Sequence, residues 1–184
     1  MFSLRPLADD DLGMVLEWRN HPNVREHMYT SHVISEEEHR AYFARVKNDP
    51  SKEYLICVDE GGVPVGVVNF VDMNEANGTA FWGFYSGDQS RRGVGLQMGY
   101  LALKHVFGNL GIRKLNAEVL GTNVVGLRFQ QGLGFKVEGV FKHHHLTNSG
   151  YVDVYRLGMF GDDWFNKWQT LTEERLRKAV GGNR

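Results

Sequence analysis

A short stretch of the chain, Arg91-Arg92-Gly93-Val94-Gly95, combines two cationic side chains with two glycines. It stands between a segment rich in aromatic residues and an apolar segment with helical spacing. Backbone N–H groups at the start of a helix, at the positive end of its dipole, point at an anion. Glycine lets the backbone approach a ligand closely, and arginine adds positive charge. The pattern favours a phosphate-binding loop, although glycines in this arrangement also form plain turns.

Two other phosphate-binding motifs do not fit this loop. No Gly-Lys-Ser/Thr follows, as a Walker loop requires, and Met98 occupies the third glycine position of the dinucleotide fingerprint Gly-x-Gly-x-x-Gly. Neither of those motifs therefore explains the loop.

Two side chains could move a proton. In segment 114–119, strand alternation places Asn116 and Glu118 on one face and the apolar residues on the other. A carboxylate on an inner strand requires a partner or a purpose, so Glu118 is the first candidate for a catalytic proton relay. A structural ion pair with a nearby Arg or Lys is the alternative. His39 is the second candidate because its unperturbed pKa is near ~6.5, although its charged neighbours are also typical of a surface histidine.

The other metal-ligating and nucleophilic side chains give weaker signals. On a strand, His143 and His145 would share a face while His144 points away. No Cys or His at zinc-site spacing accompanies them, so we expect no metal site and instead a contact at the rim of a substrate site. Cys57, the one cysteine, lies in an apolar run and is expected in the core rather than as a nucleophile.

The composition restricts the classes of partner. Lys and Arg number 21 and Asp and Glu 22, a formal net charge of -1, so no positive excess favours nucleic acid or an anionic membrane. No apolar stretch approaches the ~20 residues of a transmembrane helix, and the N-terminus lacks the apolar core of a signal peptide. A single cysteine suits a reducing compartment. We expect a cytoplasmic protein with no nucleic-acid partner and no membrane partner.

The elements that must position these residues follow a mixed α/β order within one domain, residues 1–184. A capping box at Ser35 opens a helix, Gly61-Gly62 marks a hairpin, and Pro22 ends the first helix. The predicted helices are 9–20, 35–47, 93–107, 123–131 and, at the C-terminus, about 162–178. The predicted strands are 2–7, 53–59, 63–71, 79–85, 113–120, 135–144 and 151–159.

The loop and a second motif together resemble the GNAT superfamily of N-acetyltransferases. The loop is similar to that family's Gln/Arg-x-x-Gly-x-Gly/Ala motif, and Thr122-Asn123 through Gly134-Phe135 is similar to its Asn-led helix ending in Leu-Gly-Phe. The resemblance extends from the Phe2 strand to Trp164. It implies an α/β (α+β) fold with a central mixed, largely antiparallel twisted sheet flanked by helices. It also implies acetyl-CoA as the co-substrate.

The family's cofactor contacts carry over to a defined set of positions. They are Phe84, Tyr85, Arg91, Arg92, Gly93, Val94, Gly95, Leu96 and Asn123. Backbone N–H groups near Phe84 and Tyr85 would stabilise the developing oxyanion. Two positions depart from the pattern: Ser90 replaces Gln or Arg, and Gln130 stands where many members carry a Tyr that protonates the leaving thiolate. An amide cannot supply that proton at neutral pH, so the general acid is open and release of the thiolate to water is one possibility.

The N-terminal third resembles one branch of the family. The run from Trp18 to Arg25, then Met28-Tyr29, Ile34-Ser35 and His39, is similar to enzymes that acetylate UDP-4-amino-4,6-dideoxy-N-acetyl-β-L-altrosamine in pseudaminic acid biosynthesis. This implies a UDP-amino-sugar acceptor and a role in flagellin glycosylation or surface polysaccharide. Arg19 and Arg25 would pair with the diphosphate, and His39 and Tyr85 would contact the sugar. Solvated arginines and a core or rim tyrosine are the plain alternatives.

The expected reaction is direct attack of the sugar amine on the acetyl thioester with both substrates bound. Alignment of the reactants removes an entropic barrier on the order of 7–11 kcal/mol in good cases. The amine must be neutral, so a base or a water relay is required. A protein N-terminal acetyltransferase of the ribosomal-protein type is the main alternative, and a non-enzymatic acyl-CoA-binding module is a third. Exposed aromatics such as Phe81 and Trp82 would permit a homodimer.

Overall fold

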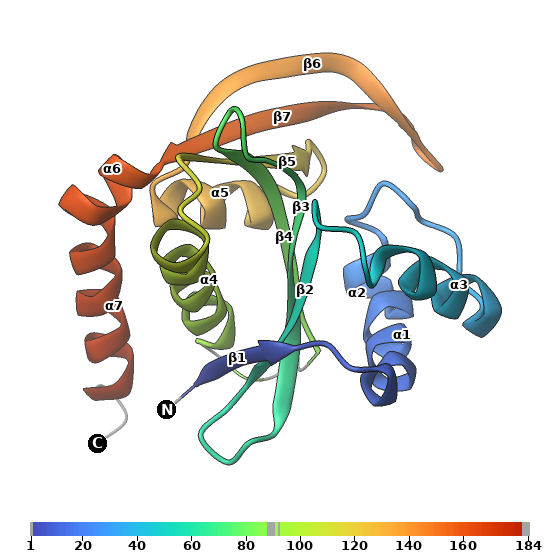
Figure 1. Ribbon diagram of the computed structural model, residues 1–184. Coiled ribbons are helices and arrows are strands. Elements are labelled where there is room, and N and C mark those ends of the chain that lie inside the picture. The colour runs from blue at the N-terminus through green and yellow to red at the C-terminus, as the bar shows by residue number, and fades with distance from the viewer. Residues whose placement is uncertain (1, 88–90, 92, 182–184) are drawn as a thin grey trace.

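The computed structural model describes residues 2–87, 91 and 93–181. Its centre is a twisted seven-stranded sheet of order β1-β2-β3-β4-β5-β7-β6, with helices on both faces (Figure 1). The strands are β1 (Ser3–Pro6), β2 (Glu53–Val58), β3 (Pro64–Asn74), β4 (Thr79–Ser86), β5 (Lys114–Leu120), β6 (Lys136–Thr147) and β7 (Gly150–Phe160). Among the strand pairs of the described residues, only β4 and β5 run parallel. The mixed, largely antiparallel sheet flanked by helices is thereby confirmed.

The helices divide between the two faces of the sheet. They are α1 (Leu12–Asn20), α2 (Pro22–Arg25), α3 (Glu36–Val46), α4 (Val94–Lys104), α5 (Val124–Leu133), α6 (Gly161–Asp163) and α7 (Gln169–Gly181). In Figure 1, α1, α2 and α3 lie on one side of the central strands, and α4 and α5 on the other, with α7 beside α4. Among the described residues, no helix is long and apolar enough to span a membrane.

One helix was not expected from the sequence. We took Pro22 as the end of the first helix, but it is also the first residue of α2. Proline suits that position because its missing N–H is not needed there and its φ is already helical. The side chain of His21 caps the new helix, with its Nδ1 accepting from the N–H of Asn23 at 3.3 Å. The chain therefore turns at His21 and places Arg25 one short helix beyond Arg19.

The core has two parts, one on each face of the sheet. The larger lies under α4, α5 and α7 and includes Phe70, Met98, Leu103 and Trp164. The smaller lies under α1, where Val15, Ile56 and Val67 are buried together. Cys57 is fully buried in the larger part, and this burial raises the pKa of its thiol to about 12. The prediction that Cys57 is a core residue is confirmed.

The two aromatics that suggested a dimer surface are not exposed. Trp82 retains 6% of its accessible surface because it stacks on Phe135, with ring centroids 5.4 Å apart. Phe81 is half-buried beneath the guanidinium of Arg156, whose Cζ lies 4.4 Å from the ring centroid. The sequence argument for a homodimer therefore has no support from these residues.

Candidate functional site

The two parallel strands part shortly after they meet. β4 and β5 pair only from Thr79↔Lys114 to Phe81↔Asn116, while β4 stays paired with β3 as far as Ser86. The buried side chain of Asn116 spans the last rungs, with Nδ2 donating to the carbonyl of Ala80 at 3.1 Å. Beyond this point the β5-facing edge of β4 has no strand partner in the described part of the chain. Backbone groups near Phe84 and Tyr85 are thus left at a split in the middle of the sheet, available to a ligand.

Side chains along β4 point alternately to the two faces. Phe84 turns toward α5, where its ring centroid lies 5.3 Å from that of Phe129. Tyr85 turns to the other face and packs with Val15 and Val67. Burial raises the pKa of the Tyr85 hydroxyl, so it remains protonated at neutral pH. The split therefore connects two sides: a donor side toward α4 and α5, and an acceptor side toward α1, α2 and α3.

The glycine loop has the backbone geometry that an anion site needs. Gly93 caps α4 with φ +84, and a Cβ added there would meet nothing within 4 Å. The first hydrogen bond within the helix is donated by the N–H of Leu96 to the carbonyl of Gly93 at 3.1 Å. The N–H groups of Val94 and Gly95 therefore have no acceptor in the helix. The positive helix end and the open space at Gly93 fit a bound pyrophosphate.

The predicted arginines of the loop are placed only in part. Arg91 Nη1 pairs with Asp59 Oδ2 at 2.6 Å, and its guanidinium also lies over the ring of Phe2. The hydrogen bond from Arg91 holds the pKa of the Asp59 carboxyl below its ordinary value. Arg91 is thus turned toward the β2–β3 turn rather than toward the start of α4. Arg92 and Ser90 lie outside the described residues.

The second motif forms the helix that covers the donor side. The Oδ1 of Asn123 accepts from the N–H of Gly126 at 2.8 Å and caps α5, so its oxygen has a structural role. Phe129 and Leu133 of α5 pack against Gly99 of α4, where an added Cβ would lie 3.0 Å from Leu133 Cδ1. Gln130 is 8% exposed, and its Oε1 is buried without a hydrogen-bond partner. That oxygen can accept a hydrogen bond from a ligand but cannot protonate one.

Glu118 has partners on the acceptor side. Its Oε1 accepts from Arg156 Nε at 3.0 Å and pairs with Nη2 at 2.8 Å. Its Oε2 accepts from the hydroxyl of Tyr29 at 2.6 Å. The ion pair corresponds to the structural alternative considered from the sequence, but it sits on the face that also carries Tyr85. The role of Glu118 as a proton relay stays a prediction.

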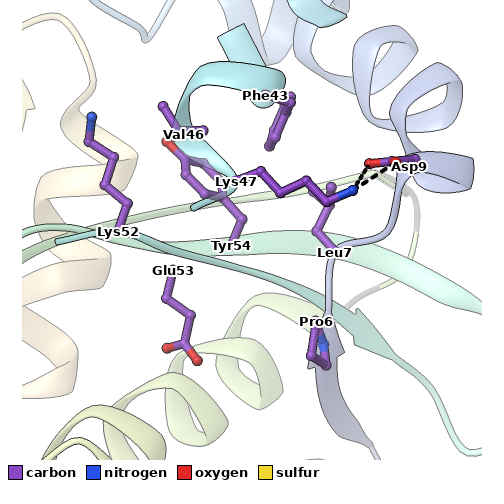
Figure 2. Close-up of a pocket in the computed structure, with 9 residues that line it drawn as sticks. All are labelled: Pro6, Leu7, Asp9, Phe43, Val46, Lys47, Lys52, Glu53 and Tyr54. Carbon is purple, nitrogen blue, oxygen red and sulfur yellow. Dashed lines mark hydrogen bonds and ion pairs between the residues drawn. The ribbon is translucent and has the colours of Figure 1, made fainter. Parts of the chain in front are cut away.

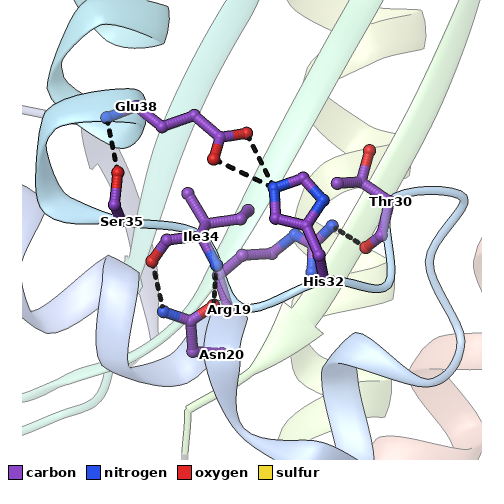
Figure 3. Close-up of polar contacts among 7 residues, drawn as sticks. All are labelled: Arg19, Asn20, Thr30, His32, Ile34, Ser35 and Glu38. Atoms are coloured by element: carbon purple, nitrogen blue, oxygen red, sulfur yellow. Dashed lines mark hydrogen bonds and ion pairs between the residues drawn. The ribbon is translucent and has the colours of Figure 1, made fainter.

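The two N-terminal arginines are partly buried and not fully paired. Arg19 Nη2 donates to the carbonyl of Thr30 at 2.9 Å, as Figure 3 shows, while its Nη1 is buried with no partner among the described residues. The same holds for the Nε of Arg25. Burial lowers the pKa of the Arg19 guanidinium, and the nearby charge of Arg25 lowers it further. The picture of both arginines on freely solvated helix faces is therefore wrong.

His39 is a buried histidine rather than a surface one. It is 5% exposed and meets the ring of Phe43 edge-on at 4.9 Å between centroids. Its Nε2 is buried without a hydrogen-bond partner. Burial lowers the pKa of the imidazole, against the smaller opposing effect of a hydrogen bond to the backbone of Leu12. The ring is neutral at pH 7 and could accept a proton.

The three consecutive histidines lie on a bulge rather than on a regular strand. The pairing of β6 with β7 moves from Phe141↔Val154 to His145↔Val152, so β6 contains two extra residues there. His143 adopts φ +47, and its N–H donates to Asp153 Oδ1 at 2.9 Å. Simple alternation, which would place His143 and His145 on one face, therefore does not apply. Within the described residues, no group of three His, Cys, Asp or Glu side chains is arranged to hold a metal.

A hollow of about 200 Å³ lies away from the split, between β1, β2 and α3 (Figure 2). Lys47 reaches across its edge to Asp9, with both carboxylate oxygens at 2.8 Å. It is lined by Pro6, Leu7, Asp9, Phe43, Val46, Lys47, Lys52, Glu53 and Tyr54. None of the predicted site residues is among them, and the volume is below the roughly 300–1,000 Å³ of most small-molecule sites. This hollow is not the acceptor site.

Two residues of the acceptor side were given no individual role from the sequence. Arg156 lies on β7, where strand alternation marks only a polar position. Tyr29 lies in an irregular segment, 89 positions before the glutamate that it contacts. No local pattern reports such a distant pairing.

Comparison with known proteins places these features in a family. Residues 2–136 match the family model described as an acetyltransferase (GNAT) domain. The chain is similar to the acetyltransferase PseH of Campylobacter jejuni, with 28% identity over 131 residues, 71% of this chain and 80% of that protein. It is also similar to the spermidine N(1)-acetyltransferase of Escherichia coli, with 25% identity over 178 residues, 96% of this chain and 95% of that protein.

Solved structures show the same fold. The spermidine N-acetyltransferase from Vibrio cholerae, in complex with CoA and spermine, superposes with a TM-score of 0.84 over 90% of this chain and 98% of that one. The sequence identity is 20%, so the likeness concerns the fold.

Proposed function

This chain belongs to the GNAT family of acetyltransferases, and from that premise we propose that it acetylates the 4-amino group of a UDP-linked 4-amino-4,6-dideoxy sugar. The family makes it an acetyl-CoA-dependent N-acetyltransferase acting on a small-molecule acceptor. The identity of that acceptor is the proposal. The similarity to PseH and the N-terminal run from Trp18 to Arg25 support it, with the product entering pseudaminic acid biosynthesis and flagellin glycosylation.

The observation that carries the proposal is the pair of incompletely bonded arginines. In the part of the chain that the structure describes, Arg19 Nη1 and Arg25 Nε are buried without acceptors, and the two charges oppose one another. A buried cationic donor without an acceptor is unfavourable, because it has lost its hydration without replacement. The diphosphate of a UDP-sugar would supply acceptors to both groups and neutralise their repulsion. Arginine suits this ligand because its planar fork matches phosphate oxygens.

The same charges argue against a polyamine acceptor. Spermidine is the acceptor in the name of one relative, and it is a polycation. On the acceptor side it would meet the positive charges of Arg19 and Arg25. The nearby carboxylates are engaged, Glu118 by Arg156 and Glu38 by His32 at 2.9 Å (Figure 3). A polyamine would therefore gain little attraction and encounter repulsion.

Different residues of the site would have different roles in the reaction. Gly93, Val94 and Gly95 would hold the pyrophosphate of acetyl-CoA at the start of α4, and the free edge of β4 near Phe84 would stabilise the oxyanion. Glu118 is the first candidate to take the amine proton. His39, neutral because of its burial, is the second. Gln130 could accept a hydrogen bond, and the thiolate would take its proton from water.

A screen of acceptors with isotopically labelled acetyl-CoA tests the proposal. The acceptors are the UDP-4-amino-4,6-dideoxy sugar, the same sugar without UDP, spermidine, and a peptide with a free N-terminus. We expect label transfer to the UDP-sugar and much weaker transfer to the free sugar. Equal rates with both sugars would contradict the proposed contacts of the arginines with the diphosphate. Faster transfer to spermidine or to the peptide would show that the acceptor is not the UDP-sugar.

Arg19→Ala and Arg25→Ala test directly whether the two arginines bind the diphosphate. Each should raise the KM for the UDP-sugar by about tenfold or more, since a charge-assisted hydrogen bond is involved. The KM for acetyl-CoA should stay unchanged, because its loop lies on the other side of the split. Arg40→Ala, an exposed arginine paired with Glu36, serves as the matched control. Equal effects of all three variants would contradict the proposal.

The proposed compartment is the cytoplasm. The single, buried cysteine suits a reducing environment, which supports this assignment. Fractionation of cells that express a tagged chain would test it.

A further inference from the structure

Residues 26–34, here called the acceptor strap, connect the end of α2 to Ser35, the N-cap of α3. In Figure 1 it extends from α2 toward the free end of the β6–β7 hairpin. At its middle, Tyr29 makes two contacts with the C-terminal half of the sheet. Its hydroxyl donates to Glu118 Oε2 of β5 at 2.6 Å, and its ring meets that of His145 edge-on, with centroids 4.9 Å apart at 90°. The strap thus connects elements on both sides of the β4–β5 split.

The C-terminal half of the strap is held by α1. Asn20 clasps Ile34 with two hydrogen bonds, Nδ2 to the carbonyl at 2.9 Å and Oδ1 from the N–H at 2.8 Å (Figure 3). Arg19 Nη2 holds the carbonyl of Thr30 at 2.9 Å. Several hydrogen bonds therefore join α1 to the backbone of the strap. Among the described residues, the hydrogen bond that joins the strap to β5 is the one from the hydroxyl of Tyr29.

We infer that Tyr29 is a positioning residue of this site: it closes the acceptor strap over the acceptor side and orients the Glu118 carboxylate toward the amine. The inference rests on the proposed function and deepens it. Arg156 donates twice to Oε1 of Glu118, whereas Tyr29 donates once to Oε2, so Oε2 retains an acceptor site for the amine. The hydrogen bond from Tyr29 fixes the direction of that site.

The hydroxyl of Tyr29 is suited to this position. Loss of solvent at the hydroxyl and the neighbouring Glu118 carboxylate raise the pKa of Tyr29 well above its ordinary value, so it donates at all physiological pH. The hydrogen bond therefore holds the Glu118 carboxylate in one direction while that carboxylate accepts from the acceptor amine. A sugar bound under the strap then lies between Arg19 and Glu118.

Tyr29→Phe tests the inference, because it removes the hydroxyl and keeps the ring against His145. The matched control is Tyr100→Phe, which removes a similar tyrosine–glutamate bond, Tyr100 to Glu173 at 2.7 Å, between α4 and α7. Hydrogen–deuterium exchange of peptides from the strap should speed up in Tyr29→Phe and not in the control. The kcat/KM for the UDP-sugar should fall about tenfold, the effect of one lost hydrogen bond to a charged group, with the KM for acetyl-CoA unchanged.

A double-mutant comparison separates positioning from simple loss of stability. In a Glu118→Ala background, Tyr29→Phe should have no further effect on kcat/KM, because the two side chains act through one bond. Unchanged strap exchange in Tyr29→Phe, or independent effects of the two substitutions, would overturn the inference. The exchange measurement needs no acceptor. A wild-type protein that ignores the UDP-sugar therefore refutes the proposed function while the strap attachment is still decided.

Discussion

Burial changes the chemistry of His39 more than its sequence neighbours suggest. The residue stands among charged side chains in α3, yet its ring faces Phe43 under α1 and is 5% exposed. The charged form of the imidazole is disfavoured there, which lowers its pKa. His39 is buried because its side chain lies on the inner side of α3, whereas its neighbours in the chain point to other sides of that helix.

The depressed pKa of His39 predicts a pH dependence of stability. The folded chain binds fewer protons than the unfolded chain as pH falls past the ordinary histidine pKa of about 6.5. The contribution to stability is present above that pH and is lost as pH falls through the folded pKa. The free energy of unfolding, measured with urea between pH 7.5 and 5, should fall less in His39→Asn than in wild type. His27→Asn, at an exposed position, should follow wild type.

A direct titration checks the same statement. The Cε1–H proton signal of His39, assigned by its loss in His39→Asn, should titrate with a midpoint below about 6.5. A midpoint at or above that value would contradict the effect of burial on the pKa of His39.

At the scale of elements, the start of α4 is where sequence and structure agree most closely. The loop pattern predicted a helix opening at Gly93, and the structure caps α4 there with φ +84 and open space at the missing Cβ. Glycine is needed because a left-handed conformation costs other residues about 1–2 kcal/mol. The same open space would receive the phosphate ligand, so a side chain placed there has two separate effects.

Gly93→Trp should abolish acetyl-CoA binding, because the indole fills the space at the helix start. Gly111→Trp is the matched control, since Gly111 also has a positive φ, +63, and nothing within 4 Å of its missing Cβ. Both variants carry the same kind of backbone strain, but only the first stands in the loop. Calorimetric titration with acetyl-CoA should show lost binding in Gly93→Trp alone. Retained affinity in that variant would refute the loop assignment.

At the scale of the whole molecule, the C-terminal helices are locked onto the catalytic fold by close contacts. Trp168 lies against Gly134 at the end of α5, where an added Cβ would come within 2.4 Å of Trp168 Cδ2. Trp164 is fully buried in the larger part of the core, and its ring lies 6.0 Å from that of Tyr100 in α4 and 6.5 Å from that of Phe107, between centroids. Trp164 and Trp168, which follow the family match of residues 2–136, thus complete the core that supports α4 and α5.

Gly134→Ala should therefore destabilise the entire chain. The collision with the Trp168 indole adds to the strain of φ +109, and we expect a loss of about 3 kcal/mol in the free energy of unfolding. Gly62→Ala, at φ +78 with nothing within 4 Å, isolates the strain and should cost about 1–2 kcal/mol. Urea unfolding of both variants measures the difference. Equal losses would show that the contact with Trp168 is not tight.

The sequence by itself determined the features that neighbouring residues encode. Helical periodicity, the Gly61-Gly62 turn, the Ser35 cap and the glycine loop located the elements within a few residues and predicted a phosphate-binding loop. The acetyl donor was implied by the resemblance of two motifs to the GNAT family. Asn123 to Phe135 marked the second helix of the site. These signals are local, since caps, turns and periodicities depend on residues a few positions apart.

Tertiary structure alone decided how distant segments meet. It set the point at Phe81 and Asn116 where β4 and β5 part, the burial of Arg19 and Arg25, and the bulge that turns the three histidines. It also joined Tyr29 to Glu118 across 89 residues. The physical reason is that such contacts follow from the packing of whole faces against one another, and no stretch of the sequence records which face it will meet.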